Sequence, residues 1–145
     1  MTPIVVRSEK GYQTAISIRS HSVVADELIQ DGGTDVGPTP MEIFIGTLGA
    51  CVAVTTRAYA ERKGWPLEGI SVELGMARIK REAYPAYAGE APYVHEIREH
   101  ICFEGPLTEE QKERLMSVAR KCPIRLVLEN PVFIVEEPRE DKVAR

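Results

Sequence analysis

The chain has 145 residues, of which 43% are hydrophobic and 28% charged, and its net charge is −4. This composition is typical of one globular domain and too apolar for a disordered chain, and the acidic balance gives no attraction for a nucleic-acid backbone. We therefore expect a single domain over residues 1–145, with a solvated charged tail at 136–145 and no nucleic-acid partner.

The sequence contains no strong signal for export or for a membrane. No basic segment leads into an apolar one at the N-terminus, so no secretory signal is expected. The most apolar stretch, Ile43 to Val54, is interrupted by glycine and threonine, and a membrane span needs roughly 20 apolar residues. Three cysteines are too few for a secreted disulfide scaffold. We expect a cytoplasmic protein with no membrane partner.

The first forty residues predict strands followed by a loop. Residues 12–18 alternate between apolar and polar side chains, which is typical of a half-buried strand. Shorter candidate strands at 4–6 and 21–25 flank it, with turn-forming residues between them. Glycine, proline and aspartate are frequent over 26–40, which predicts a loop before a helix.

Residues 41–63 predict a long helix that ends at Gly64. Two apolar rows recur at spacings of three and four residues, and a helix apolar on more than one face is normally buried on more than one side. Its length would be about 34 Å. Small residues would let another backbone approach closely, namely Gly46, Gly49, Ala50 and Ala53. We infer that the second face of this helix meets a partner subunit.

Two more strands are predicted by the alternation over 70–76 and 93–103, on either side of a loop at 83–92 rich in proline and tyrosine. The spacing of Thr108 and Gln111 matches a capping box, which predicts the start of another helix.

The residues after this helix predict that it ends, and that a second helix begins, at Cys122. Pro123 suits the first turn of a short helix and makes Cys122 its N-cap. Cys122 also shares an apolar stripe with Leu115, Val118 and Ala119. The short helix should end at Asn130, and residues 132–135 predict a last strand.

The cysteines differ in their surroundings. Cys51, in an apolar helix, could be a small core residue only. Cys122 lies among basic residues at a helix start, so we expect its pKa to be lowered. Cys102 alternates on the polar side of its strand and receives no role. A thiol in an apolar helix and a second at a basic helix junction favour a dithiol redox site and predict a thiol peroxidase.

Other chemistries find little support. The chain has no Cys-x-x-Cys pair, and its histidines are not spaced as zinc ligands relative to the cysteines, so no metal is expected. No Gly-x-Ser-x-Gly occurs, so a serine hydrolase is disfavoured.

Motifs around both cysteines, over about Tyr12 to Val135, carry a family resemblance. They are Ala25-Asp26-Glu27, Gly32-Gly33-x-Asp35-x-Gly37-Pro38-x-Pro40-x-Glu42, Leu48-Gly49-Ala50-Cys51 and Ala119-x-Lys121-Cys122-Pro123-Ile124. The chain resembles the OsmC/Ohr family of osmotically inducible and organic hydroperoxide resistance proteins, in its general OsmC-like branch.

The resemblance implies an α+β fold, in which antiparallel sheets wrap long central helices in an intertwined homodimer with active sites at the interface. It also implies that Cys51 is the peroxidatic residue and Cys122 the resolving one. A Cys51 sulfenic acid would condense with Cys122 to a disulfide, which an external dithiol, of lipoyl type or another thiol, would reduce. No cofactor is implied.

In the family an arginine from the N-terminal strands, held by a glutamate early in the central helix, activates the first cysteine. Arg19 and Glu42 are the candidates here. Glu42 precedes Cys51 by nine residues, which is half a turn out of phase in a straight helix at about 100° per residue. A kink at the helix glycines, or a role in the partner's site, would reconcile them. Glu42 could instead be a helix N-terminal carboxylate, and Arg19 a surface arginine.

These inferences predict a cysteine-based peroxidase that favours organic hydroperoxides, with Phe44, Leu48 and Tyr59 lining the pocket around Cys51. The alternative is a non-catalytic OsmC-like stress or small-ligand-binding protein.

Overall fold

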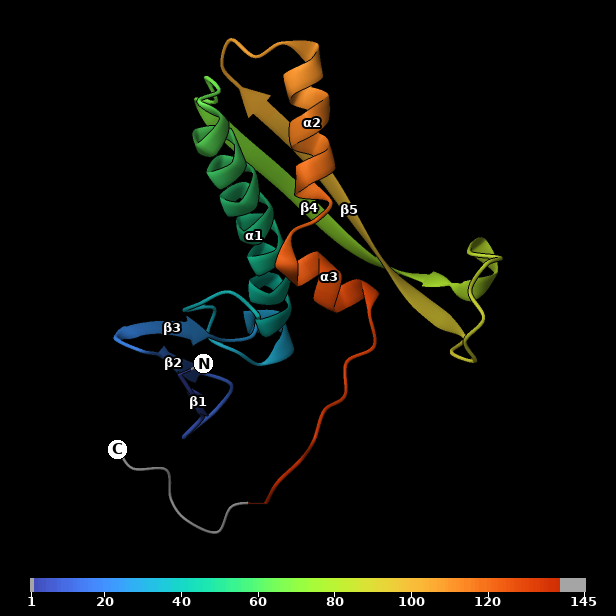
Figure 1. The fold of residues 1–145 in the computed structure, drawn as a ribbon. Helices are drawn as coiled ribbons and strands as arrows, with labels where there is room; N and C mark the ends of the chain where they lie inside the picture. Colours follow the sequence, from blue (N-terminus) through green and yellow to red (C-terminus); the bar gives the residue numbers. More distant parts are fainter. Residues whose placement is uncertain (1, 139–145) are drawn as a thin grey trace.

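A long helix crosses a two-stranded antiparallel sheet, and a three-stranded sheet lies beside the start of that helix in the computed structural model, which describes residues 2–138 (Figure 1). The elements in chain order are β1 (Ile4–Arg7), β2 (Thr14–Ile18), β3 (His21–Ala25), η1 (Ile29–Asp31), α1 (Pro40–Lys63), β4 (Gly69–Lys80), η2 (Arg81–Ala83), β5 (Tyr93–Glu104), α2 (Glu109–Ala119) and α3 (Pro123–Glu129). The predicted α+β class with antiparallel sheets is confirmed. The structure contains one chain, so the intertwined homodimer stays a prediction.

The loop between the first sheet and α1 is organised by a buried carboxylate. Asp26 is 1% exposed. Its oxygens accept hydrogen bonds from Thr34 Oγ1 (2.6 Å), Thr34 N (3.0 Å), Glu27 N (2.9 Å) and Val36 N (3.3 Å). A Cβ at Gly33 would overlap the Glu27 backbone. The Asp-Glu and Gly-Gly motifs therefore build the turn that leads into the helix.

Helix α1 begins one residue earlier than predicted, because Thr39 and Glu42 form a capping box. Thr39 Oγ1 accepts from the Glu42 N–H (3.3 Å), and Glu42 Oε2 accepts from the Thr39 N–H (2.7 Å). Pro40 occupies the first helical position and Gly64 closes the helix with a φ of 65°. The capping box and the Gly64 N–H satisfy backbone groups that a helix end leaves without partners, and Pro40 has no N–H that would need one.

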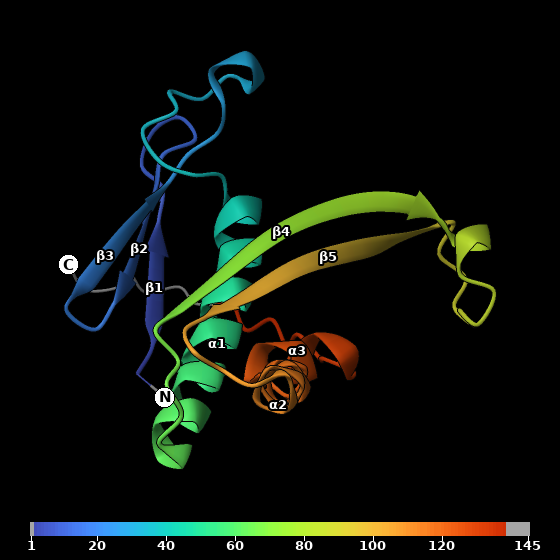
Figure 2. The same cartoon turned by 90° about the horizontal axis from the view of Figure 1, so that it is seen from above.

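Strands β4 and β5 form a long hairpin, paired from Gly69↔Glu104 to Lys80↔Tyr93. One end of the hairpin packs against α1, and the other extends away as an arm that carries residues 81–92 at its tip (Figure 2). At Gly49 an added Cβ would lie 2.5 Å from Leu74 Cδ1. This small position of α1 therefore serves close packing of the sheet within one chain.

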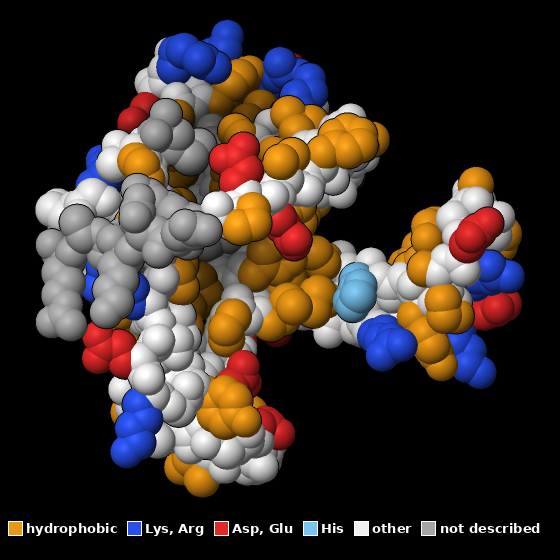
Figure 3. All heavy atoms as spheres, turned by 90° about the horizontal axis from the view of Figure 1, so that it is seen from below, with side chains coloured by type: hydrophobic (Ala, Val, Ile, Leu, Met, Phe, Trp, Pro, Cys, Tyr) orange, Lys and Arg blue, Asp and Glu red, His pale blue; other side chains and the backbone are white. Residues whose placement is uncertain are grey.

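The core has two clusters along α1. The first, which we call the cysteine cluster, consists of Leu48, Val52, Ala119 and Cys122, with Cys51, Val72, Leu74, Ile97, Ile101 and Ile124 packed against it. The second consists of Ala60, Leu67, Leu107 and Leu115, with Tyr59, Trp65, Ile70 and Phe103 around it. Figure 3 shows apolar side chains along the concave face between the helical body and the β4–β5 arm.

Helix α1 is long and apolar enough to cross a membrane by length and composition, although the sequence prediction considered only its middle. Core helices of soluble proteins meet the same criterion. Here α1 contacts β4, α2 and α3, so packing within the chain explains part of its apolar character. The absence of a membrane partner stays a prediction.

The strand predicted at 132–135 is wrong for the described part of one chain. This segment is irregular, and Val132, Phe133 and Ile134 are 62%, 87% and 84% exposed. A strand needs a neighbouring edge to pair with, and within residues 2–138 none lies beside it. Of the predicted tail, residues 136–138 are exposed and 139–145 lie outside the described residues.

Candidate redox site

The structure brings the two predicted cysteines together. Cys51 projects from the middle of α1 and is half-buried, whereas Cys122 is fully buried between α2 and α3. Both are free thiols in the cysteine cluster, where Cys51 packs against the buried group that contains Cys122 and lies close enough to affect the pKa of that thiol. Two free thiols in one cluster are the parts that reversible disulfide formation requires.

The lining of this site is largely apolar. The inward faces of β4 and β5 contribute Val72, Leu74, Ile97 and Ile101, because alternate residues of a strand face the same side. The side chains around the two cysteines are therefore largely apolar.

Cys122 is the N-cap of α3, as predicted. Its Sγ accepts a hydrogen bond from the Arg125 N–H at 3.4 Å, and Pro123 stands at the first helical position. The predicted lowering of its pKa is wrong, however. Burial raises the pKa of the Cys122 thiol, and contact with Cys51 raises it further, against the lowering by the backbone N–H groups of Arg125 and Ile124.

The physical reason is that desolvation disfavours the thiolate more than the helix start favours it. Arg120 and Lys121, which motivated the prediction, are exposed to solvent. Water and salt therefore screen the effect of these two charges on the Cys122 thiolate.

An ion pair that sequence reasoning missed lies beside Cys122. The Arg125 guanidinium pairs with Glu99, whose side chain is only 8% exposed, while that of Arg125 is 25% exposed. Glu99 stands between Ile97 and Ile101 on the inward face of β5, and both isoleucines pack against the cysteine cluster. The sequence did contain a signal for this pair, because Glu99 takes a position in the alternating strand where its neighbours in the same row, Ile97 and Ile101, are apolar.

The predicted activating pair is not assembled at Cys51 within one chain. Arg19 lies in the turn between β2 and β3, exposed and with a φ of 55°. Glu42 is held at the Thr39 cap, and no hydrogen bond or ion pair among residues 2–138 links either side chain to Cys51. Their catalytic roles stay predictions that require a partner subunit or a movement.

Of the three residues predicted to line a pocket around Cys51, Leu48 belongs to the cysteine cluster and Phe44 and Tyr59 do not. Phe44 is 42% exposed. Tyr59, eight residues after Cys51 and thus about 12 Å further along the helix, packs in the second cluster. There its hydroxyl accepts a hydrogen bond from Arg114 Nε at 3.0 Å.

The third cysteine lies apart from this pair. Cys102 is exposed on β5, opposite Ser71 of β4. Among the residues the structure describes, no group of three or more histidine, cysteine, aspartate or glutamate side chains could hold a metal ion.

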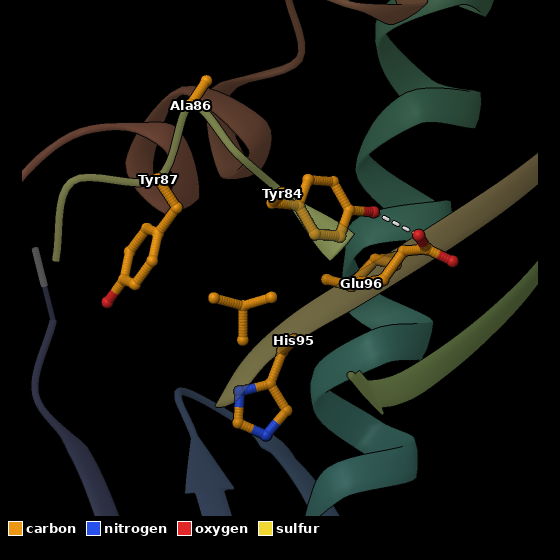
Figure 4. A pocket seen from close by; sticks show the side chains of 7 residues that line it. Tyr84, Ala86, Tyr87, His95 and Glu96 are labelled. Carbon is orange, nitrogen blue, oxygen red and sulfur yellow. Dashed lines mark hydrogen bonds between the residues drawn. The ribbon is translucent and has the colours of Figure 1, made fainter. Parts of the chain in front are cut away.

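A separate hollow of about 430 Å³ lies at the tip of the β4–β5 arm, lined by Tyr84, Ala86, Tyr87, Val94, His95, Glu96 and Ile97. Figure 4 shows the Tyr84 hydroxyl directed at Glu96, with Tyr87 and His95 on other sides of the hollow. Hydrogen bonds from Tyr84 and Arg98 lower the pKa of the Glu96 carboxyl. These contacts brace the arm, and no cysteine lines this hollow.

The fold and the site together define an α+β protein with a two-cysteine centre built on a long core helix. The family model described as OsmC-like protein matches residues 32–137. The chain therefore belongs to the OsmC-like family, and the resemblance seen in the sequence is confirmed. No curated protein sequence matches the chain.

Solved structures share the fold at low sequence identity. An OsmC-like protein from Mycoplasma pneumoniae is 18% identical with a TM-score of 0.67, over 88% of this chain and 86% of the other. An organic hydroperoxide resistance protein OsmC from Legionella pneumophila is 16% identical with a TM-score of 0.61, over 88% and 90%. At these identities the similarity establishes the fold alone.

Proposed function

We propose that the protein is a thiol-dependent peroxidase that reduces organic hydroperoxides through Cys51 and Cys122. The observation that carries the proposal is the packing of these two free thiols, which come from distant parts of the chain, into one cluster. The name of the Legionella pneumophila relative, an organic hydroperoxide resistance protein, agrees with this chemistry.

The first step takes place at Cys51. Its thiolate attacks the terminal peroxide oxygen, so that an S–O bond forms while the O–O bond breaks and the sulfur is oxidised. The products are a Cys51 sulfenic acid and an alkoxide, which takes up a proton and leaves as the alcohol. The half-exposed position of Cys51 supports its role as the sulfur that meets the substrate.

The second step forms the disulfide. The Cys122 sulfur displaces the sulfenic hydroxyl, and water leaves with the thiol proton. An external dithiol then donates two electrons and two protons, which restores both thiols and oxidises the dithiol. Burial and a raised pKa make Cys122 a poor first nucleophile, which supports its assignment as the resolving residue.

The protein is also proposed to work as a homodimer. Large apolar side chains of α1 remain exposed in one chain, including Met41 at 52% and Val54 at 69%. The segment 132–135 and the projecting arm likewise leave apolar surface and strand edges without a neighbour in the described chain. A second copy would cover such surfaces.

The experiment that tests the function is peptide mapping after addition of one equivalent of cumene hydroperoxide. We expect a disulfide between Cys51 and Cys122, and turnover when dihydrolipoamide is supplied. Cys51→Ser should abolish turnover, and Cys122→Ser should leave a sulfenic acid that dimedone traps. Cys102→Ser is the matched control and should change neither result. Turnover that survives Cys51→Ser would contradict the proposal.

One observation favours the second candidate, a non-catalytic small-ligand-binding protein. The raised pKa of Cys122 disfavours its thiolate at neutral pH, and the side chains around it are apolar. Two thiols that stay reduced under excess hydroperoxide would support this candidate over the peroxidase.

A further inference from the structure

The Glu99–Arg125 pair at the cysteine cluster has polar capacity that its own ion pair does not use. Arg125 Nη2 bonds Glu99 Oε2, and Arg125 Nη1 lies 3.8 Å from Glu129 Oε1. Glu99 Oε1 and Arg125 Nε are both buried, and neither has a hydrogen-bond partner among the residues the structure describes. A buried acceptor and a buried donor left in this way cost free energy, so a ligand that pairs with both would be stabilised at this place.

The position of the pair connects it to the sulfurs. Leu74 lies opposite Glu99 in the β4–β5 register, and it packs against the cysteine cluster with Ile97 and Ile101. Arg125 is tied to the same place from the other side, because its backbone N–H bonds Cys122 Sγ. The ion pair therefore borders the cluster that contains both thiols.

A hydroperoxide group matches this donor and acceptor. Its terminal O–H can donate to a carboxylate oxygen, and its oxygens can accept from a guanidinium N–H. The organic substituent would then rest on the apolar lining. We propose that Glu99 and Arg125 are the polar subsite that binds and orients the hydroperoxide group for attack by Cys51, an inference that rests on the proposed function.

The pair would act in the first step without gaining or losing electrons. Glu99 Oε1 holds the terminal O–H, which becomes the hydroxyl of the sulfenic acid. Arg125 Nε–H faces the negative charge that develops on the departing alkoxide oxygen. Fixed donors of this kind act on charge that develops during reaction, where they are worth more than in water.

Two variants test the subsite and keep the backbone bond to Cys122. Arg125→Lys retains the positive charge but loses the planar guanidinium and its Nε–H. Glu99→Leu combined with Arg125→Met removes both charges together, which avoids leaving one buried charge without its partner. Arg98→Met is the matched control, because Arg98 belongs to the neighbouring pair with Glu96 and its side chain is 74% exposed.

The measurements are the single-turnover rate constant of Cys51 with cumene hydroperoxide and its alkylation by iodoacetamide, which has no O–O–H group. We expect both variants to lose about 100-fold in the peroxide reaction, and to alkylate within about threefold of the unaltered protein. Circular dichroism verifies that each variant is folded. The control should match the unaltered protein in both reactions.

Three results would overturn the inference. Either folded variant that keeps the peroxide rate constant would overturn it and leave the peroxidase function intact. An equal fall in peroxide reaction and alkylation would mean that the pair acts on Cys51 and does not recognise the peroxide. Failure of the unaltered protein to react with hydroperoxide would overturn the proposed function and this inference together.

Discussion

Cys122 and Arg125 are joined by a backbone hydrogen bond, in which the Arg125 N–H donates to the Cys122 Sγ over 3.4 Å. The guanidinium of the same arginine reaches across to Glu99 on β5. One residue in the first turn of α3 thus connects the buried sulfur to the buried carboxylate. The thiol, the ion pair and the strand are consequently held as one unit.

The first prediction concerns the ionisation of Cys122. In a Cys51→Ser/Cys102→Ser variant Cys122 is the only thiol, and burial, the largest cause of its raised pKa, remains. We expect alkylation to be slow near neutral pH and to increase only above the ordinary thiol pKa of 9.0. The rate constant with iodoacetamide, followed from about pH 6 to pH 10, measures this. A midpoint well below 9.0 would contradict the prediction.

The second prediction concerns the start of α1. Thr39→Ala should lower the free energy of unfolding by about 1 kcal/mol, because the Glu42 N–H loses its acceptor. Glu42→Ala should also destabilise, because the Thr39 N–H loses its partner. Urea unfolding of the two single variants and the double variant gives their coupling. If the two losses simply add, the two hydrogen bonds of the capping box stabilise the helix independently of each other.

The third prediction concerns acid unfolding through Asp26. Hydrogen bonds, above all from Thr34, lower the pKa of Asp26 from its ordinary value of 3.8. Because the pKa is lower in the folded protein, the unfolded chain takes up the proton first as the pH falls. The contribution of the ionised Asp26 to the free energy of unfolding is therefore complete above pH 3.8, and it is lost as the pH falls through the pKa of the folded protein.

Asp26→Asn should therefore be less stable than the unaltered protein at neutral pH, with a difference that shrinks below pH 3.8. Urea unfolding at a series of pH values measures that difference. Asp35→Asn is a suitable control in the same loop. If the difference in free energy of unfolding between the variant and the unaltered protein stays constant below pH 3.8, an ionised Asp26 is not the stabilising group.

The fourth prediction concerns the proposed dimer. Val54 is 69% exposed on α1, and with Ala53, Arg57, Ala58, Glu61 and Ile70 it lines a hollow of about 400 Å³. Val54→Asp would place an unpaired charge in an apolar interface, so we expect sedimentation velocity to show a shift from dimer to monomer. Glu73→Gln, on β4, is the control. A mass unchanged by Val54→Asp would place the dimer contact elsewhere.

Several features of this protein could be predicted from the sequence because they depend on local physics. Alternation of apolar residues located β2, β4 and β5, and the spacing of Thr108 and Gln111 located the start of α2. The order of Cys122 and Pro123 predicted the cap of α3. The same local rule, applied to Thr39-Pro40-x-Glu42, would also have found the first residue of α1 and the role of the Glu42 carboxylate there.

Only the tertiary structure could decide the remaining points, because they depend on what lies beside a residue in space. The segment 132–135 has strand-forming residues but no neighbouring edge in the described chain. The charges around Cys122 were visible in the sequence, but its complete burial was not, and burial sets the direction of its pKa. The pairing of Glu99 with Arg125 spans 26 positions, so only the packing of α3 against β5 could bring that carboxylate to the cysteines.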